Sequence, residues 1–322
     1  MSQPATGTPP AGNPAPELNN AVPVRHPGRW ISAVVIIGVL FLLIQSMFTN
    51  PNFRWDVVGT YILDVKVVQG VGWTLILTVA SMLIAIVLAI VLAVMRQSGN
   101  PVLRYTAWLW VWFFRGTPVY TQLAFWGLIS VLYPKISAGV PFGPELFSID
   151  TSTVVTVLVA AILGLGLNES AYLAEIFRAG LKSVDKGQTE AAQALGMSDT
   201  KIMWRIILPQ AMRIIVPPTG NETIGMLKTT SLVLAVPFTL DLTFATNALA
   251  NRIYLPVPLL IVAAIWYLVI TSLLMVGQHY IEAYYGRGVD NLAPAAIKPD
   301  KTKAGHRAAV GPGDDLPKEA TK

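Results

Sequence analysis

Ionisable side chains stand inside segments of this sequence that are otherwise almost wholly apolar. Glu169, Glu222 and Lys228 occupy such segments, and Arg115 stands near the end of another. A charged side chain at the centre of a membrane-spanning helix costs about 2.5–3.5 kcal/mol on insertion scales, so it normally faces a bundle interior or a water-filled cavity. These residues indicate either a pathway for a polar solute or structural ion pairs and polar contacts between helices.

The spacing of the polar residues limits how they pair. Glu222 and Lys228 are six residues apart, which does not place them on one helical face, so each needs another partner. Asn168 precedes Glu169 directly. Gln122 follows a proline by four residues on one face, where its amide would hydrogen-bond a polar ligand or hold neighbouring helices together.

Prolines interrupt two of the apolar segments. Pro118, which follows Thr117, breaks or kinks its helix and frees carbonyl groups that need water or a neighbouring side chain. Such a break suits a pathway for a polar solute. The Pro217-Pro218 pair would also break a helix, but proline is well accommodated in a first turn, and the sequence favours a helix start there.

The motifs of common catalytic sites are absent from the sequence. It contains no Gly-x-x-x-x-Gly-Lys-Ser/Thr phosphate loop, no His-Glu-x-x-His and no Gly-x-Ser-x-Gly. Its cysteine count is 0, and its 3 histidines are far apart. We therefore expect no catalytic residue, no metal site and no cofactor bound by this chain.

Composition places the chain among polytopic membrane proteins. Of 322 residues, 53% are hydrophobic and only 13% are charged, against about 25% charged in an ordinary soluble domain. The net charge of +5 lies mainly in connecting segments and in the C-terminal tail, which is not the pattern of a nucleic-acid-binding face.

Hydropathy predicts an all-α bundle of about six transmembrane helices. Residues 1–29 are predicted to be a disordered tail and 286–322 a flexible basic tail. Residues 30–48 would be a first spanning helix or a signal peptide, and the absence of a cleavage pattern favours a retained helix. The segment 51–68 is compatible with a loop or an interfacial helix, and 134–150 with a loop. The further predicted spans are 71–95, 105–133, 153–177, 214–240 and 255–280.

Lysine and arginine are distributed unevenly between the two sides that these spans define. With a cytoplasmic N-terminus, most basic residues and the basic tail lie inside, and only Arg54, Lys66, Lys135 and Arg252 lie outside. The asymmetry predicts a multi-pass protein of the cell membrane with both termini in the cytoplasm. It also places the polar stretch 187–209 on the cytoplasmic side.

The stretch 187–209 has the features of two short helices joined at a glycine. Helix formers fill 190–195, Gly196 can adopt the left-handed conformation that ends a helix, and Ser198 can cap a second helix that stops near Pro209. Ala191 and Ala192 expose little bulk, so a partner could approach the backbone closely. The alternative is a surface connector between spanning helices.

Several of these motifs, in this order, resemble the membrane permease subunits of ATP-binding-cassette importers, in particular the polar amino acid branch that includes histidine, glutamate, glutamine, arginine and opine permeases. The Glu-Ala-Ala-x-x-x-Gly pattern at 190–196 resembles that of binding-protein-dependent importers in general. The Arg-Gly-Thr-Pro at 115–118 and the Leu-Lys-x-Thr-Ser-Leu at 227–232 resemble the amino acid branch. Further matching stretches are 72–75, 122–123, 171–180 and 208–211.

The resemblance covers residues 70–285 and implies a type I importer permease domain of five core helices, with 30–48 as an additional helix. It implies a second permease subunit, identical or different, an extracytoplasmic substrate-binding protein and a separate ATPase that holds ATP and Mg²⁺. The stretch 187–209 would be the coupling loop on which the ATPase docks. The loop residues carried over from the family are Gly187, Glu190, Ala191, Ala192, Gly196, Leu208 and Pro209.

The candidate substrate pathway then comprises Arg115, Thr117, Pro118, Gln122, Asn168, Glu169, Glu222 and Lys228. Many relatives have a small residue where Glu169 stands, and a carboxylate there could meet the ammonium of any amino acid or the side chain of a cationic one. Other functions stay open at this point: a permease for another small solute such as an opine or a sulfur amino acid, an ion-coupled secondary transporter with a proton relay through Glu169, Glu222 and Lys228, or a membrane scaffold.

Overall fold

The computed structural model describes residues 27–139 and 145–286 of the chain. Residues 1–26 of the predicted N-terminal tail and 287–322 of the predicted C-terminal tail lie outside the described part. The chain divides into two compact units, Met1–Phe53 and Arg54–Lys322.

The first unit contains one long helix. α1 (Pro27–Thr49) is followed by the single 3₁₀ turn η1 (Pro51–Phe53). Within α1, the segment Gly28–Thr49 is long and apolar enough to cross a membrane, and its large apolar side chains are exposed. Helix α1 therefore has the length and composition expected of the spanning helix that the sequence predicts at 30–48.

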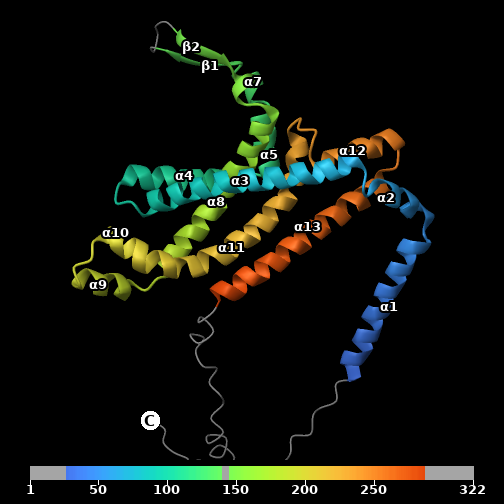
Figure 1. Cartoon of the computed structure of the whole chain (residues 1–322), viewed down its shortest axis with the longest axis horizontal. Coiled ribbons are helices and arrows are strands. Elements are labelled where there is room, and N and C mark those ends of the chain that lie inside the picture. Colours follow the sequence, from blue (N-terminus) through green and yellow to red (C-terminus); the bar gives the residue numbers. More distant parts are fainter. Residues whose placement is uncertain (1–26, 140–144, 287–322) are drawn as a thin grey trace, which may run out of the picture. The chain divides into compact units, whose positions relative to one another are not determined.

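The second unit is built almost entirely from helices (Figure 1). Its α-helices are α2 (Trp55–Tyr61), α3 (Val65–Gln97), α4 (Pro101–Gly116), α5 (Val119–Gly127), α6 (Ile129–Leu132), α7 (Thr151–Val154), α8 (Val157–Lys182), α9 (Lys186–Ala194), α10 (Asp199–Ile202), α11 (Leu208–Thr229), α12 (Leu242–Ile253) and α13 (Pro256–Tyr285). A π-helical turn η2 (Met203–Ile207) joins α10 to α11, and a 3₁₀ helix η3 (Thr230–Ala235) follows α11.

In the described part of the chain, 4 helices are long and apolar enough to span a membrane: α1, α3, α8 and α13. The predicted span 105–133 is instead divided among α4, α5 and α6, because the chain is extended at Thr117 and Pro118. The predicted span 214–240 is divided between α11 and η3. These two interrupted segments contain Pro118 and the Pro217-Pro218 pair, whereas Asn168 and Glu169 lie in the continuous helix α8.

Helices α3 and α8 make the most extensive helix–helix contact of the second unit and cross at its centre (Figure 1). Small buried residues on both helices allow this close approach, as is usual where helices associate in membranes. On α3 they are Ala85, Ala89 and Ala93, and on α8 they include Gly166, where an added Cβ would lie 3.1 Å from the Ser81 carbonyl oxygen. Helices α4, α5 and α11 pack around α8 and complete the larger hydrophobic core.

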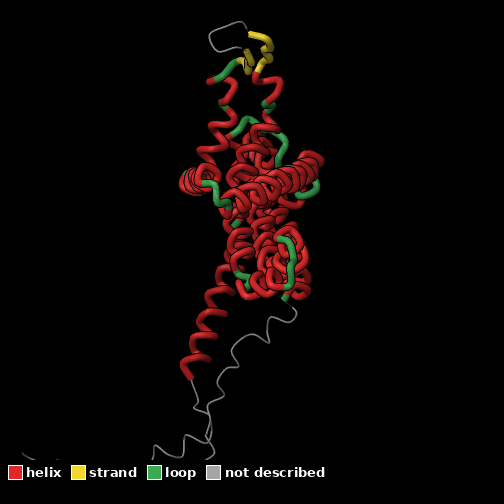
Figure 2. The backbone as a smooth tube through the Cα atoms, turned by 90° about the vertical axis from the view of Figure 1, so that its left-hand side faces the viewer, coloured by secondary structure: helices red, strands yellow, loops and turns green. Residues whose placement is uncertain are grey.

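A short antiparallel hairpin corrects the expectation of a loop at 134–150. Strand β1 (Lys135–Gly139) pairs with β2 (Glu145–Asp150), with Ile136 opposite Ile149. Figure 2 shows the two strands beyond the helical part of this unit. In these few positions, Ile and Phe alternate with polar residues, which favours strands. The loop was predicted because the same segment is rich in Gly and Pro.

The Pro217-Pro218 pair lies inside α11, so the expected helix start at this place is wrong. Side chains bond to the backbone on either side of these prolines. The Gln278 side-chain amide of α13 donates a hydrogen bond of 2.7 Å to the Pro217 carbonyl oxygen, and the Thr219 hydroxyl donates one of 2.8 Å to the Ile215 carbonyl oxygen. These bonds hold the turn that contains the prolines, whereas the carbonyl groups that lose an N–H donor are those of Arg213 and Ile214.

Gly70 and Gly72 of α3 provide a matched test of how closely α3 and α12 approach each other. A Cβ at residue 70 would lie 2.8 Å from the Leu242 Cα, whereas one at residue 72 would meet no atom within 4 Å. We expect Gly70→Ala to destabilise the protein by about 1–3 kcal/mol, since backbone cannot move aside as a side chain can. Gly72→Ala should be neutral or stabilising. Thermal unfolding in detergent measures both, and equal midpoints for the two variants would contradict the close approach.

Candidate functional site

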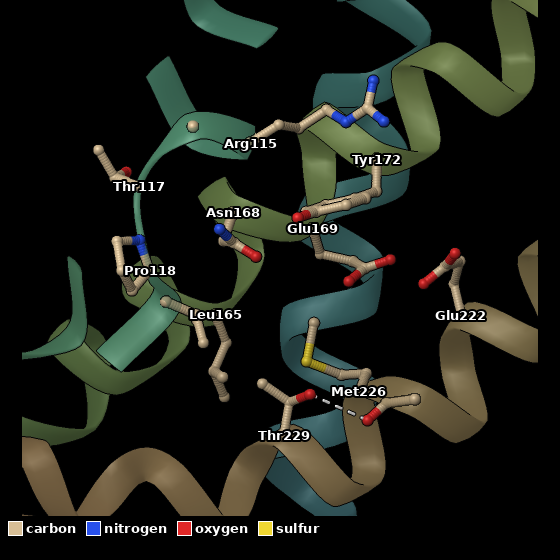
Figure 3. A pocket seen from close by; sticks show the side chains of 13 residues that line it. Arg115, Thr117, Pro118, Leu165, Asn168, Glu169, Tyr172, Glu222, Met226 and Thr229 are labelled. Atoms are coloured by element: carbon tan, nitrogen blue, oxygen red, sulfur yellow. Dashed lines mark hydrogen bonds between the residues drawn. The ribbon is translucent and has the colours of Figure 1, made fainter. Parts of the chain in front are cut away.

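A cavity of about 510 Å³ lies between the break that separates α4 from α5, the middle of α8 and the second half of α11 (Figure 3). Six of the residues predicted for the substrate pathway line it: Arg115, Thr117, Pro118, Asn168, Glu169 and Glu222. The other lining residues are Gly116, Val119, Leu165, Tyr172, Gly225, Met226 and Thr229. The cavity therefore brings together residues from three segments that are far apart in the sequence.

Three side chains that line the cavity, those of Tyr172, Met226 and Thr229, were not among the residues predicted from charge, polarity and proline position. Tyr172 follows Glu169 by three residues, and Met226 and Thr229 follow Glu222 by four and seven. These spacings place residues on one helical face. Helical periodicity counted from the two glutamates would have identified all three.

Side chains hold the break at Thr117 and Pro118. Gln122 Nε2 donates to the Phe114 carbonyl oxygen at 3.0 Å, to the Thr117 carbonyl oxygen at 3.1 Å and to Thr117 Oγ1 at 2.7 Å. From α8, Asn168 Nδ2 donates to the Phe114 carbonyl oxygen at 2.8 Å and to Gln122 Oε1 at 3.3 Å. The carbonyl groups released at the end of α4 thus have hydrogen-bond partners.

Gln122 is 5% exposed and does not line the cavity. The sequence left two roles open for Gln122, a hydrogen bond to a polar ligand or a contact between helices. Its hydrogen bonds to Phe114, Thr117 and Asn168 support the contact between helices. Lys228 also lies outside the cavity lining, and its side chain is exposed. The structure therefore does not bring Lys228 together with Glu169 and Glu222.

Two carboxyl groups face each other in the cavity. Figure 3 shows the side chains of Glu169, on α8, and Glu222, on α11, pointing toward one another. Glu169 is only 8% exposed, and its Oε1 atom has no hydrogen-bond partner among the described residues. Neither glutamate forms an ion pair with a described lysine or arginine. The cavity wall thus presents two carboxyl groups that form no ion pair within the described part of the chain.

A guanidinium group lies at another part of the same cavity. The Arg115 guanidinium carbon is 5.2 Å from the centre of the Tyr172 ring, a distance typical of a cation–π contact. One turn farther along α8, Glu175 pairs with Arg178 Nε at 2.9 Å and with Arg96 Nη2 at 3.4 Å. Glu175 is therefore occupied by other cations, and Arg115 remains the one arginine or lysine that lines the described cavity.

The stretch 187–209 forms a second surface of possible functional importance. Asp185 caps α9 by accepting a hydrogen bond from the Gly187 backbone N–H at 2.6 Å, and α9 carries Glu190, Ala191 and Ala192. The helix ends as predicted at Gly196, whose φ is 75°. There the Met197 N–H donates to the Ala192 carbonyl oxygen at 3.1 Å and the Gly196 N–H to the Gln193 carbonyl oxygen at 2.9 Å, which is the Schellman arrangement.

The second short helix differs in detail from the expectation. Ser198 occupies the N-cap position of α10, but its side chain makes no capping hydrogen bond. Pro209 does not end this helix. Instead, α10 passes through the π-helical turn into α11, which begins at Leu208 and has Pro209 in its first turn, where its missing N–H carries no penalty.

Large apolar side chains are exposed on these otherwise polar helices. Leu195 is 83% exposed and Trp204 is 67% exposed, whereas Ala192 is buried. Exposed apolar residues rimmed by polar ones commonly mark sites of protein association.

Comparison with known proteins identifies the family. Residues 85–285 match the model of the binding-protein-dependent transport system inner membrane component. The chain belongs to this family. Its members are permease subunits of ATP-binding-cassette importers, so the chain is a transport subunit and a multi-pass membrane protein of the type I importer fold.

Relatives with described roles are amino acid permeases. The chain is 48% identical over 281 residues to the arginine transport system permease protein ArgU of Corynebacterium glutamicum, covering 87% of each chain. It is 38% identical over 209 residues to the histidine/lysine/arginine/ornithine transport system permease protein HisM of Escherichia coli K12, covering 64% of this chain and 83% of HisM. A solved structure described as an amino acid ABC transporter with histidines aligns with a TM-score of 0.56 at 32% identity, covering 68% of this chain and 94% of the other.

Gln122→Leu tests whether this amide holds the break between α4 and α5. The change keeps the approximate shape but leaves the Thr117 carbonyl and hydroxyl without this donor, so we expect a loss of about 1–3 kcal/mol in stability. Gln210→Leu is the control, because Gln210 is exposed and donates only to the Ile206 carbonyl oxygen one turn earlier. Thermal unfolding of both purified variants provides the measurement, and an unchanged midpoint for Gln122→Leu would contradict the structural role.

Proposed function

We propose that this amino acid importer permease moves cationic amino acids through the cavity formed by α4, α5, α8 and α11. The observation that carries the proposal is Glu169, which is buried, lacks a partner at Oε1 and faces Glu222. A buried carboxylate without a cation is costly, so the arrangement favours binding of a positively charged group from outside the chain. The guanidinium or ammonium group of an amino acid side chain supplies that charge.

The size and charge distribution of the cavity suit this substrate class. A volume of about 510 Å³ is in the range of small-molecule sites. The carboxyl groups of Glu169 and Glu222 attract the cationic side chain, and Arg115 lies where it can attract the substrate carboxylate. Relatives whose names specify arginine, or histidine, lysine, arginine and ornithine, agree with a cationic substrate for this chain.

We further infer that a separate ATPase subunit docks on α9 and α10. The exposed Leu195 and Trp204 offer apolar area, and the small Ala191 lets a partner approach the α9 backbone. ATP and Mg²⁺ would be held by that partner, and this chain would bind no cofactor. In this arrangement α9, α10 and both termini lie on the cytoplasmic side, as the lysine and arginine distribution predicts.

Two more partners complete the proposed transporter. A second permease subunit, identical or different, would form the other half of the pathway, and an extracytoplasmic binding protein would deliver the amino acid. Membership of the importer family supports both. An ion-coupled secondary transporter is not favoured, and the position of Lys228 outside the cavity gives no support to a proton relay through it.

Neutralising either glutamate tests the substrate site. We expect Glu169→Gln and Glu222→Gln each to lower ATP-driven arginine uptake into vesicles about tenfold to a hundredfold, because a hydrogen bond to a charged group contributes about 1.5–3 kcal/mol. Glutamine uptake should fall less, since this substrate has no cationic side chain. Asp150→Asn, on the exposed hairpin, is the control for loss of one carboxylate, because the Asp150 side chain makes no capping hydrogen bond. Unchanged arginine uptake in both cavity variants, with normal assembly, would refute the proposed site.

Changes on α9 test the docking surface. We expect Glu190→Lys and Gly196→Asp to abolish co-purification of the ATPase while the permease still inserts in the membrane, because each change places a new charge on the proposed contact. Asp150→Lys, a charge reversal on the hairpin far from α9 in the chain, should leave co-purification unchanged. Recovery of the ATPase at normal yield with the α9 variants would show that it docks elsewhere.

A further inference from the structure

A second cavity, of about 340 Å³, lies between the first turns of α3 and helix α12. It shares no lining residue with the site between α4, α8 and α11. Lys66 and Arg252 are the charged residues that line it. Polar side chains are contributed by Gln69 and Thr239, and aromatic ones by Trp73 and Phe244.

The positive charge of this cavity has no counter-charge in the described part of the chain. Neither Lys66 nor Arg252 forms an ion pair there, and both side chains are exposed. Two aspartates stand close by in the sequence, but both cap helices. Asp64 accepts a hydrogen bond from the Lys66 backbone N–H at 2.8 Å, and Asp241 accepts from the Thr243 and Phe244 N–H groups at 2.9 and 3.3 Å. Neither aspartate lines the cavity.

Both cations stand near the first residue of a helix that is long and apolar enough to span a membrane. Lys66 is the second residue of α3, which has 33 residues and is therefore about 50 Å long, more than the hydrocarbon core of about 30 Å requires. Arg252 precedes the first residue of the spanning helix α13 by four positions. The backbone carbonyl of Ile62, shortly before α3, accepts a hydrogen bond of 2.8 Å from Trp266 of α13. This contact joins the segment before α3 to the first half of α13, and the lysine and arginine distribution predicts that both helices begin on the outer side.

The neighbouring surface is apolar at this level. Val65 and Val68 of α3 and Leu240 at the cavity edge are exposed. Tryptophan, as at position 73, is enriched where hydrocarbon meets the polar headgroups. A ligand that fits this cavity would therefore have an anionic group, which would lie between Lys66 and Arg252. It would also have apolar atoms, which would pack against the rings of Trp73 and Phe244.

We propose that this cavity binds the headgroup phosphate of an anionic phospholipid. Lys66 and Arg252 pair with the phosphate oxygens, Arg252 through its planar guanidinium. The Gln69 amide and the Thr239 hydroxyl hydrogen-bond to the phosphate or to the glycerol headgroup, and Trp73 and Phe244 pack against the glycerol backbone and the first methylene groups. The bound lipid joins α3 to α12 and neutralises the two cations.

Lipid binding to the full-length protein, purified in the complex that it forms, tests the proposal. Native mass spectrometry with phosphatidylglycerol, phosphatidylcholine or inorganic phosphate as the probe measures each affinity. We expect phosphatidylglycerol to bind preferentially, and K66Q/R252Q to weaken its binding about thirtyfold, since each basic residue near an anionic surface contributes about a factor of five. R54Q/K135Q is the control, because it removes the same charge from segments outside the cavity.

Three outcomes would overturn the proposal. In the first, K66Q/R252Q and the control bind phosphatidylglycerol equally. In the second, inorganic phosphate competes as well as the lipid, which would assign the cavity to a free anion. In the third, K66Q/R252Q retains lipid binding but loses stimulation by an extracytoplasmic binding protein, which would assign the cavity to protein docking. None of these outcomes depends on whether cationic amino acids pass through the other cavity.

Discussion

The requirement that backbone polar groups find partners inside a membrane governs the site of this protein. At Thr117 and Pro118 the helix stops, and hydrocarbon offers no water for the carbonyl groups that are released. Gln122 and Asn168 supply the missing donors. Asn168 belongs to α8 and also lines the cavity. Its hydrogen bond to the Phe114 carbonyl oxygen therefore holds α8 beside the end of α4, and this places the next residue, Glu169, on the cavity wall.

Among the described residues, five side chains have a buried polar atom without a hydrogen-bond partner: Ser81, Arg96, Thr151, Glu169 and Asp241. Glu169 is the one of these that lines the cavity. Gln122, with similar burial, has hydrogen bonds to three acceptor atoms, whereas Glu169 Oε1 has none among the described residues. The neighbouring Glu175 is fully paired with arginines. On α8, Glu175 is therefore paired with cations of the chain itself, whereas Glu169 faces the cavity without one. This difference is consistent with a cationic substrate that binds at Glu169.

The two candidate surfaces, the cavity and the stretch 187–209, are joined by continuous helices. α8 carries Glu169 and ends at Lys182, shortly before α9, and α11 begins at Leu208, after α10, and carries Glu222. Any displacement of α9 and α10 by a docked partner would therefore be passed to both glutamates along helices. The hydrogen bond from Gln278 to the Pro217 carbonyl oxygen joins α11 to α13 at the two prolines.

The sequence by itself determined the membrane class, the helical fold, the importer family and the left-handed Gly196, because hydropathy, motif order and glycine chemistry are local properties of the chain. It also identified Glu169 and Glu222 as unusual, because the cost of a charge in hydrocarbon does not depend on its neighbours. Only the tertiary structure decided that these two face each other, that Gln122 is a structural contact and Lys228 lies apart, and that Pro217-Pro218 lies within α11. Each of these depends on a partner distant in sequence, such as Asn168 for Gln122 and Gln278 for Pro217, and sequence spacing carries no information about such contacts.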